Sequence, residues 1–281
     1  MPSSPSDTVV DDGANPDAPT VTAASAQPGL IARNQSWLTP VALFLVVRLI
    51  GVLVLARFTD LRGGSVRDAL SSWDGKWMLD IAQYGYGGVP FSQADAHGYR
   101  DANTPYAFFP GYPMLVGAVA KIPGFSTFGA AMTVNVVVGC IGAVGAARLG
   151  ALCCRLMAER TARSGHHSAG GWFTDSLGLS SRISLWLNST TSSTSTADPR
   201  RVGLILVVLF AAAPMGVVLS MAYTETLFCA LAVWALVGVL EKRWVLAGVV
   251  TMFAGLTRPT AVVLVGGVML AALLARRDGP K

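Results

Sequence analysis

The sequence predicts an all-α, polytopic helical membrane protein with an extracytoplasmic first loop. Of its 281 residues, 52% are hydrophobic and only 13% are charged, whereas soluble domains carry about 25% charged residues. The mean hydropathy is +0.52, and long apolar runs alternate with polar segments. The net charge of +5 matches the excess of Lys and Arg in the cytoplasmic loops of membrane proteins. We therefore expect membrane lipids and no nucleic acid as partners.

The first part of the chain is predicted to be a tail followed by a membrane span. Residues 1–36 are rich in Ser, Ala, Pro and Asp, and a segment with so few large apolar residues is expected to be disordered. Trp37 to Ala56 has about the ~20 residues that cross a bilayer. Arg48 interrupts this span, at a cost of roughly 2.5–3.5 kcal/mol on insertion scales. Arg48 is therefore either functional or structural, by snorkelling or by pairing with another helix.

The next segments are a polar first loop and a second span. Residues 58–106 form the loop, with helical pieces, and the apolar run Met114 to Ala120 is too short to span a bilayer. We interpret that run as a re-entrant or interfacial helix. Phe128 to Leu152 is long enough to cross. Residues 37–157 thus form a first unit of spans that carries the loop.

The last part of the chain is predicted to be a cytoplasmic loop and a helical bundle. Residues 158–200 include a Ser/Thr tract of the kind found in flexible, low-complexity inserts. Residues 201–281 form the bundle, with spans at Val202 to Leu219, Thr224 to Leu240, Trp244 to Leu256 and Ala261 to Leu274.

Basic residues indicate the orientation of these spans. Arg and Lys are concentrated in residues 148–201 and at Lys242-Arg243 and Arg276-Arg277, which places these segments and the N-terminus in the cytoplasm. The first loop and the turns 223–226 and 257–260 then lie together on the outer face. Three polar motifs on one face predict one site there. We predict no metal site, because the cysteines and histidines lack metal-ligand spacing.

Four motifs carry a family resemblance. They are Trp73-Asp74-Gly75 with Gly85-Tyr86, Phe108-Phe109-Pro110-Gly111-Tyr112-Pro113, Ala222-Tyr223-Thr224-Glu225-Thr226 and Gly255-Leu256-Thr257-Arg258-Pro259-Thr260. In this order, over roughly residues 37–275, the chain resembles the PIG-V-like mannosyltransferases, the family of the second mannosyltransferase of GPI-anchor assembly and its bacterial relatives.

The resemblance implies a GT-C fold with its site on the non-cytoplasmic face. It also implies a polyprenyl- or dolichyl-phosphate mannose donor, a lipid or glycan acceptor, no further cofactor, and a catalytic acid at Asp74. A bacterial member would lie in the plasma membrane and would not make a GPI anchor. Family members are usually longer, so we expect this chain to be a truncated, split or partner-dependent form, with a helical membrane partner.

Mannose transfer needs a base for the attacking hydroxyl and cations for the leaving phosphate. Asp74 is the candidate base, and one base suffices for inversion in a single displacement; the alternative is a helix N-cap. Arg258 is the first candidate for the phosphate because arginine binds phosphate through two hydrogen bonds, and its alternative is an interfacial anchor. Lys76 and Arg100 are further donor-binding candidates.

The remaining candidates concern the acceptor and the sugar. Glu225 could orient an acceptor hydroxyl or form an ion pair with Arg258, and this pair could be structural. Tyr223, Trp73 and Trp77 could stack on sugar or prenyl units, although aromatic residues also belong to the interfacial belts of membrane proteins. Two other functions stay open from the sequence: a non-catalytic subunit of a glycosyltransferase complex, and a membrane transporter or flippase.

Overall fold

The computed structural model describes residues 30–95, 97–164 and 197–277. The chain divides into two units, Met1–Gln35 and Ser36–Lys281. Most of the predicted tail and of the predicted 158–200 loop lie outside the described residues. Where those two segments are described, residues 30–36 are helical, residues 158–164 belong to a long helix that continues the second span, and residues 199–200 begin another helix. The predictions of a disordered tail and of a loop are therefore wrong at these positions.

Throughout the described residues the secondary structure is helical, which confirms the predicted all-α class. The elements are α1 (Leu30–Leu61), α2 (Val66–Leu70), α3 (Asp74–Tyr84), η1 (Tyr86–Gly88), η2 (Thr104–Ala107), α4 (Gly111–Ala120), α5 (Thr127–Ser164), α8 (Pro199–Ala211), η3 (Gly216–Ser220), α9 (Glu225–Leu240), α10 (Trp244–Gly255) and α11 (Ala261–Arg277).

Two of these helices are long and apolar enough to cross a membrane. They cover Trp37–Leu61, with 25 residues, and Thr127–Ala162, with 36 residues. Only 11% of the most apolar 18-residue stretch of the first helix is buried. Leu49, Ile50 and Leu53 each expose more than half of their surface. An apolar helix that stays uncovered on most sides is typical of a membrane span rather than of a soluble core.

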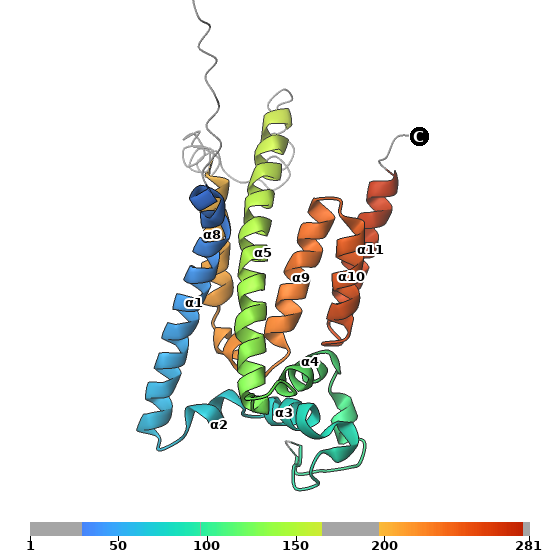
Figure 1. The fold of residues 1–281 in the computed structure, drawn as a ribbon. Coiled ribbons are helices and arrows are strands. Elements are labelled where there is room, and N and C mark those ends of the chain that lie inside the picture. The colour runs from blue at the N-terminus through green and yellow to red at the C-terminus, as the bar shows by residue number, and fades with distance from the viewer. Residues whose placement is uncertain (1–29, 96, 165–196, 278–281) are drawn as a thin grey trace, which may run out of the picture. The chain divides into compact units, whose positions relative to one another are not determined.

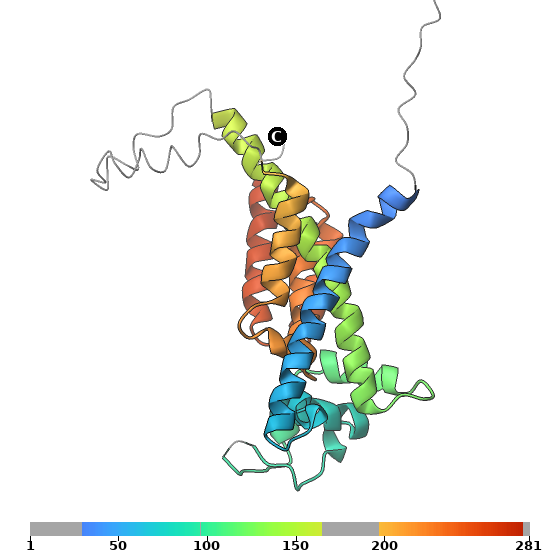
Figure 2. The ribbon, with the colours of Figure 1, turned by 90° about the vertical axis from the view of Figure 1, so that its left-hand side faces the viewer.

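The long helices form a bundle, and the short helices lie at one end of it. Figures 1 and 2 both show α2, α3 and α4 at the end where α1 finishes and α5 begins. Helix α5 packs against α8 and α9, and α10 packs against α9 and α11. The turns that lead into α9 and α11 lie at the same end as α3 and α4 (Figure 1). The fold therefore gathers the first loop and these two turns.

The predicted span from Val202 to Leu219 is wrong in its second half. Helix α8 ends at Ala211 and is followed by a turn and by η3. Pro214 disfavours helical geometry in the residue before it. In addition, the Arg48 Nη1 donates to the carbonyl of Ala211 at 2.8 Å, and its Nε donates to the Ser220 Oγ at 3.0 Å. Arg48 thus pairs with another segment, and it satisfies a carbonyl that the end of a helix leaves free.

Glycines allow α5 and α8 to approach closely. A Cβ atom added at Gly150 would lie 2.9 Å from the Cα of Gly203, and one added at Gly203 would overlap the carbonyl oxygen of Ala147. Small residues at such contacts let helix backbones meet, as in many membrane helix pairs.

We expect Gly203→Ala to destabilise the protein by about 1–3 kcal/mol, because the obstructing atom belongs to the backbone and cannot move aside. Thermal unfolding in detergent should show a melting temperature that is lower by about 3–10 °C. Gly248→Ala is the matched control, since its added Cβ meets open space. Equal melting temperatures for the two variants would contradict the close contact of α5 with α8.

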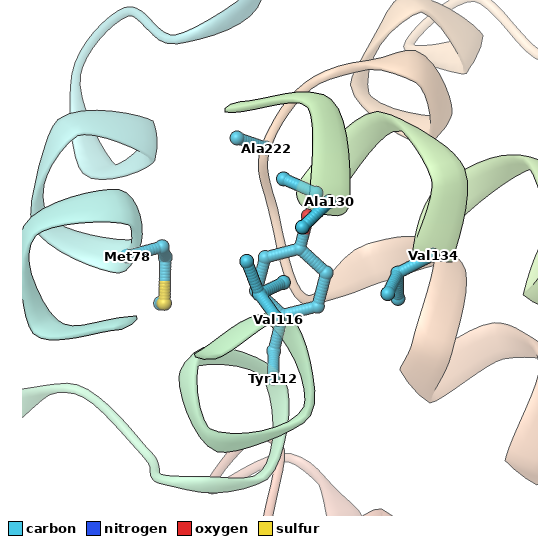
Figure 3. Packing of buried hydrophobic residues seen from close by; sticks show 7 residues of the cluster. Met78, Tyr112, Val116, Ala130, Val134 and Ala222 are labelled. Carbon is cyan, nitrogen blue, oxygen red and sulfur yellow. The ribbon is translucent and has the colours of Figure 1, made fainter. Parts of the chain in front are cut away.

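A small apolar core supports the end of the bundle that carries the motifs. Its buried members come from α3, α4, α5 and the loop before α9: Met78, Tyr112, Val116, Ala130, Ala131, Val134 and Ala222. Figure 3 shows the Tyr112 ring at the centre of this cluster, between Val116 and the α5 residues Ala130 and Val134. Four segments that are far apart in the sequence are therefore held in one packed unit.

Candidate active site

The turn between α2 and α3 presents Asp74 under unusual backbone geometry. Trp73 has φ 51° and ψ −122°, and a positive φ is rare for a bulky residue and costs of order 1–3 kcal/mol. The side chain of Trp73 is 80% exposed. Strain of this kind is concentrated at functional sites, and here it directly precedes the predicted catalytic acid.

Asp74 is the first residue of α3 and does not cap it. The cap position belongs to Trp73, which makes no capping hydrogen bond through its side chain. The Asp74 side chain is exposed. The N-cap alternative for Asp74 is therefore wrong, although a carboxylate in the first turn still interacts favourably with the helix dipole.

The turn before α9 lies directly against the Asp74 turn. The Ala222 N–H donates to the Leu70 carbonyl at 2.9 Å, and the Tyr223 hydroxyl donates to the Ser72 carbonyl at 3.0 Å. Burial raises the pKa of Tyr223, and the charge of Asp74 raises it further, against opposing hydrogen bonds from the backbone of Asp74 and Gly75. The hydroxyl therefore stays protonated, and its hydrogen bond to Ser72 holds the turn that carries Asp74 in place.

The second and fourth motifs also meet. The Gly111 N–H donates to the Leu256 carbonyl at 2.7 Å. A Cβ atom at Gly111 would lie 2.7 Å from that same oxygen and 3.2 Å from the Thr257 methyl group, so this contact requires glycine. It fixes the start of α4 beside the turn that carries Arg258.

Glu225 and Arg258 connect the third and fourth motifs. The Arg258 Nη1 lies 2.8 Å from the Glu225 Oε1, and the two side chains are 32% and 26% exposed. The guanidinium group of Arg258 also lies 5.9 Å from the centre of the Phe228 ring. Of the two sequence-based possibilities for Glu225, the structure contains the ion pair.

Sequence reasoning missed Asn135, and it placed Tyr112 in the second motif without giving it a role in the site. The buried Tyr112 hydroxyl, Asn135 Oδ1 and Glu225 Oε2 each lack a hydrogen-bond partner within the described residues, and the Asn135 Nδ2 donates to the Met221 carbonyl. A buried polar atom without a partner costs about 1–3 kcal/mol, so such atoms call for an explanation. Asn135 could have been found from the sequence, because it is a polar residue inside an apolar span.

Two predicted site residues pack within the first loop. Trp77 is 5% exposed, and its ring stacks on Phe108 with centroids 5.6 Å apart. The Arg100 guanidinium lies over Trp77 and over Phe91, 5.5 and 4.6 Å from the two ring centres, and donates to the Val89 carbonyl at 3.0 Å. Trp77 and Arg100 are therefore engaged with each other, whereas Lys76 is exposed on α3.

Asp80 lies in a polar contact within the same loop. The side-chain amide of Gln93 is oriented by two partners. Its NH2 group donates to the Asp80 carboxylate, and its oxygen accepts a hydrogen bond from the backbone N–H of Trp77 at 3.1 Å. Burial raises the pKa of Asp80, and the charge of Lys76 opposes this effect in part. The folded protein thus binds a proton at Asp80 more tightly than the unfolded chain does.

This shift predicts a pH-dependent effect of Asp80→Asn. Because the folded pKa is raised, the charged carboxylate reduces stability as the pH rises through that pKa. Asp80→Asn should therefore raise the melting temperature at pH 7, by about 1–2 °C for a partly exposed group, and the gain should vanish below the unfolded pKa of about 4. Asp68→Asn, at an exposed acid, is the control. A gain confined to acidic pH would contradict the sign of this shift.

Comparisons with known protein families, with curated proteins and with solved structures each found no match to this chain.

Proposed function

We propose that the chain is a polytopic membrane glycosyltransferase of GT-C type. It would transfer mannose from a polyprenyl- or dolichyl-phosphate mannose donor to a lipid-linked glycan acceptor on the non-cytoplasmic face. The observation that carries this proposal is the meeting of all four motifs of the resemblance: the Asp74 turn contacts the Tyr223 turn, Glu225 pairs with Arg258, and Gly111 contacts Leu256.

In the proposed reaction Asp74 acts as the general base. The acceptor hydroxyl oxygen forms a bond to C1 of mannose while the bond from C1 to the phosphate oxygen breaks, and the hydroxyl proton moves to the Asp74 carboxylate. The lipid phosphate leaves with the electron pair, and a nearby cation stabilises its charge. The exposed position of Asp74 suits a group that must reach an incoming hydroxyl.

The charge distribution supports a multi-pass arrangement with this site outside the cytoplasm. The basic residues Arg155, Arg200, Arg201, Lys242, Arg243, Arg276 and Arg277 lie in the second half of α5, at the start of α8, between α9 and α10, and at the end of α11. Those positions are at the opposite end of the bundle from α3 and α4 (Figure 1). Clustered Lys and Arg mark the cytoplasmic side, so the candidate site would lie on the outer side. Helices α1 and α5 have the length to cross the membrane, and the shorter α8, α9, α10 and α11 would run beside them in alternating directions.

The test is a transfer assay on the full chain reconstituted in lipid vesicles. Prenyl-phosphate mannose with a labelled sugar is supplied together with a lipid extract as the acceptor source, and label is followed into new lipid or glycan products. We expect transfer from the mannose donor, and little transfer from the corresponding glucose donor. The absence of transfer from every prenyl-phosphate sugar, by folded protein in vesicles and in the membranes that express it, would overturn the proposal.

A further inference from the structure

A groove between α1 and α5 has the dimensions of a ligand site. Its volume is about 510 Å³, and its walls are almost entirely apolar, with Leu49, Val52, Leu70 and Val136 among the lining residues. Ligand pockets in proteins usually measure about 300–1,000 Å³. We call this cavity the α1–α5 groove.

Arg48 lines this groove and carries a charge that no carboxylate balances in the described part of the chain. The residue is 9% exposed. Its Nε and Nη1 donate to the Ser220 hydroxyl and to the Ala211 carbonyl, while Nη2 donates no hydrogen bond within the described residues. The end of α8 supplies only about half of a negative charge. A buried charge without a full counter-charge is costly, so an anion in the groove would be stabilised.

Arg258, the cation favoured from the sequence, is in a different state. Its guanidinium is already neutralised by Glu225 at 2.8 Å. A phosphate that approached Arg258 would have to compete with that carboxylate and would experience repulsion from it. Arg48 presents neither obstacle.

The lining of the α1–α5 groove includes residues that contact the candidate active site. Leu70 lines the groove and accepts the hydrogen bond from Ala222, next to Tyr223. Asn135 lines it as well; this residue is 3% exposed and has an unpartnered Oδ1. Tyr223 is the third residue after Ser220, the partner of Arg48, which is a reach of at most about 11 Å.

We propose that the α1–α5 groove binds the prenyl chain of a lipid phosphate, with the phosphate held by Arg48. The identification of this ligand with the sugar donor rests on the function proposed above. An uncharged lipid would fill the apolar groove but would leave Arg48 without an anion. A free phosphate would balance the charge of Arg48 but would leave the apolar groove empty.

The test measures binding of radiolabelled farnesyl phosphate and farnesol to the purified full chain in detergent, by equilibrium dialysis. Val136→Trp fills the groove, and Val137→Trp is its matched control, because Val137 is equally exposed on α5 and does not line the groove. Arg48→Met removes the charge, and Arg48→Lys keeps it. The Val136 and Val137 variants leave Arg48 and its structural hydrogen bonds intact, so they decide the matter if Arg48→Met fails to fold.

We expect farnesyl phosphate to bind the native chain at least tenfold more tightly than farnesol or inorganic phosphate. Val136→Trp should weaken this binding at least tenfold, whereas Val137→Trp and Arg48→Lys should largely retain it. Equal binding by the Val136 and Val137 variants, or displacement of farnesyl phosphate by equimolar phosphatidylglycerol, would overturn the proposal. Binding that depends on Arg48 and Val136 without any sugar transfer would leave the groove assignment standing and would refute only the glycosyltransferase.

Discussion

Asp74→Asn is expected to reduce mannose transfer by about 10²–10⁴-fold, the range that a positioned general base contributes. Asparagine has nearly the same shape as aspartate but cannot accept the proton of the attacking hydroxyl. The protein should remain folded, because the Asp74 side chain is exposed and a carboxylate in the first turn of a helix contributes only about 0.3–1 kcal/mol.

Asp68→Asn is the matched control for this variant. Asp68 is also an exposed acid in the first turn of a helix of the first loop, namely α2, so the two variants lose the same charge in the same setting. Transfer rates and melting temperatures of both should be measured in one membrane preparation. A native rate for Asp74→Asn, or an equal loss in both variants, would contradict the role of Asp74 as base.

Breaking the Glu225–Arg258 ion pair is expected to produce the second largest effect. Arg258→Met and Glu225→Gln should each lower transfer by about 10–100-fold, because either change leaves the other group partly buried without its partner and shifts the turn that it holds. The double variant should lose less than the sum of the two losses in free energy, with a coupling of about 0.5–3 kcal/mol.

A charge exchange separates a structural pair from a catalytic one. Glu225→Arg combined with Arg258→Glu restores opposite charges, so a purely structural pair would recover both stability and activity. We expect recovery of the melting temperature and of most of the transfer, because the expected loss comes from the unpaired charge and the displaced turn. Arg57→Met is the control, because Arg57 pairs with Asp60 at the same 2.8 Å but with both side chains about 70% exposed, where such pairs contribute little. Additive effects at Glu225 and Arg258 would contradict their coupling.

The helices were predictable to within a few residues wherever an apolar run had clear ends. Trp244 to Leu256 became α10 at Trp244–Gly255, and Thr224 to Leu240 became α9 at Glu225–Leu240. The failure at Val202 to Leu219 has two causes, which are Pro214 within the run and a contact with a distant residue. Arg48, more than 160 residues away in the sequence, donates to the carbonyl of Ala211 where α8 ends, and a hydropathy pattern contains no trace of that contact.

The candidate site was predictable in its motifs but not in its membership. Tyr223, Glu225 and Arg258 stood out because they are polar residues between apolar runs, and Asp74 stood out because it lies between two tryptophans in a motif of the resemblance. Tyr112, Asn135 and the pairing of Trp77 with Arg100 did not, because each depends on contacts between segments that are far apart in the sequence. Local sequence indicates which residues are unusual for their surroundings, and it does not indicate which of them touch.

The sequence by itself determined the helical class of this protein, the positions of its apolar segments and the short polar turns between them, because hydropathy and helix-ending residues act locally. Only the tertiary structure decided that the four motifs contact one another, that Glu225 neutralises Arg258, and that Arg48 lines the α1–α5 groove with no balancing carboxylate among the described residues. The physical reason is that burial and charge compensation are properties of side chains brought together by packing. They arise when α3, α4, α5 and the turns before α9 and α11 meet at one end of the bundle (Figure 1).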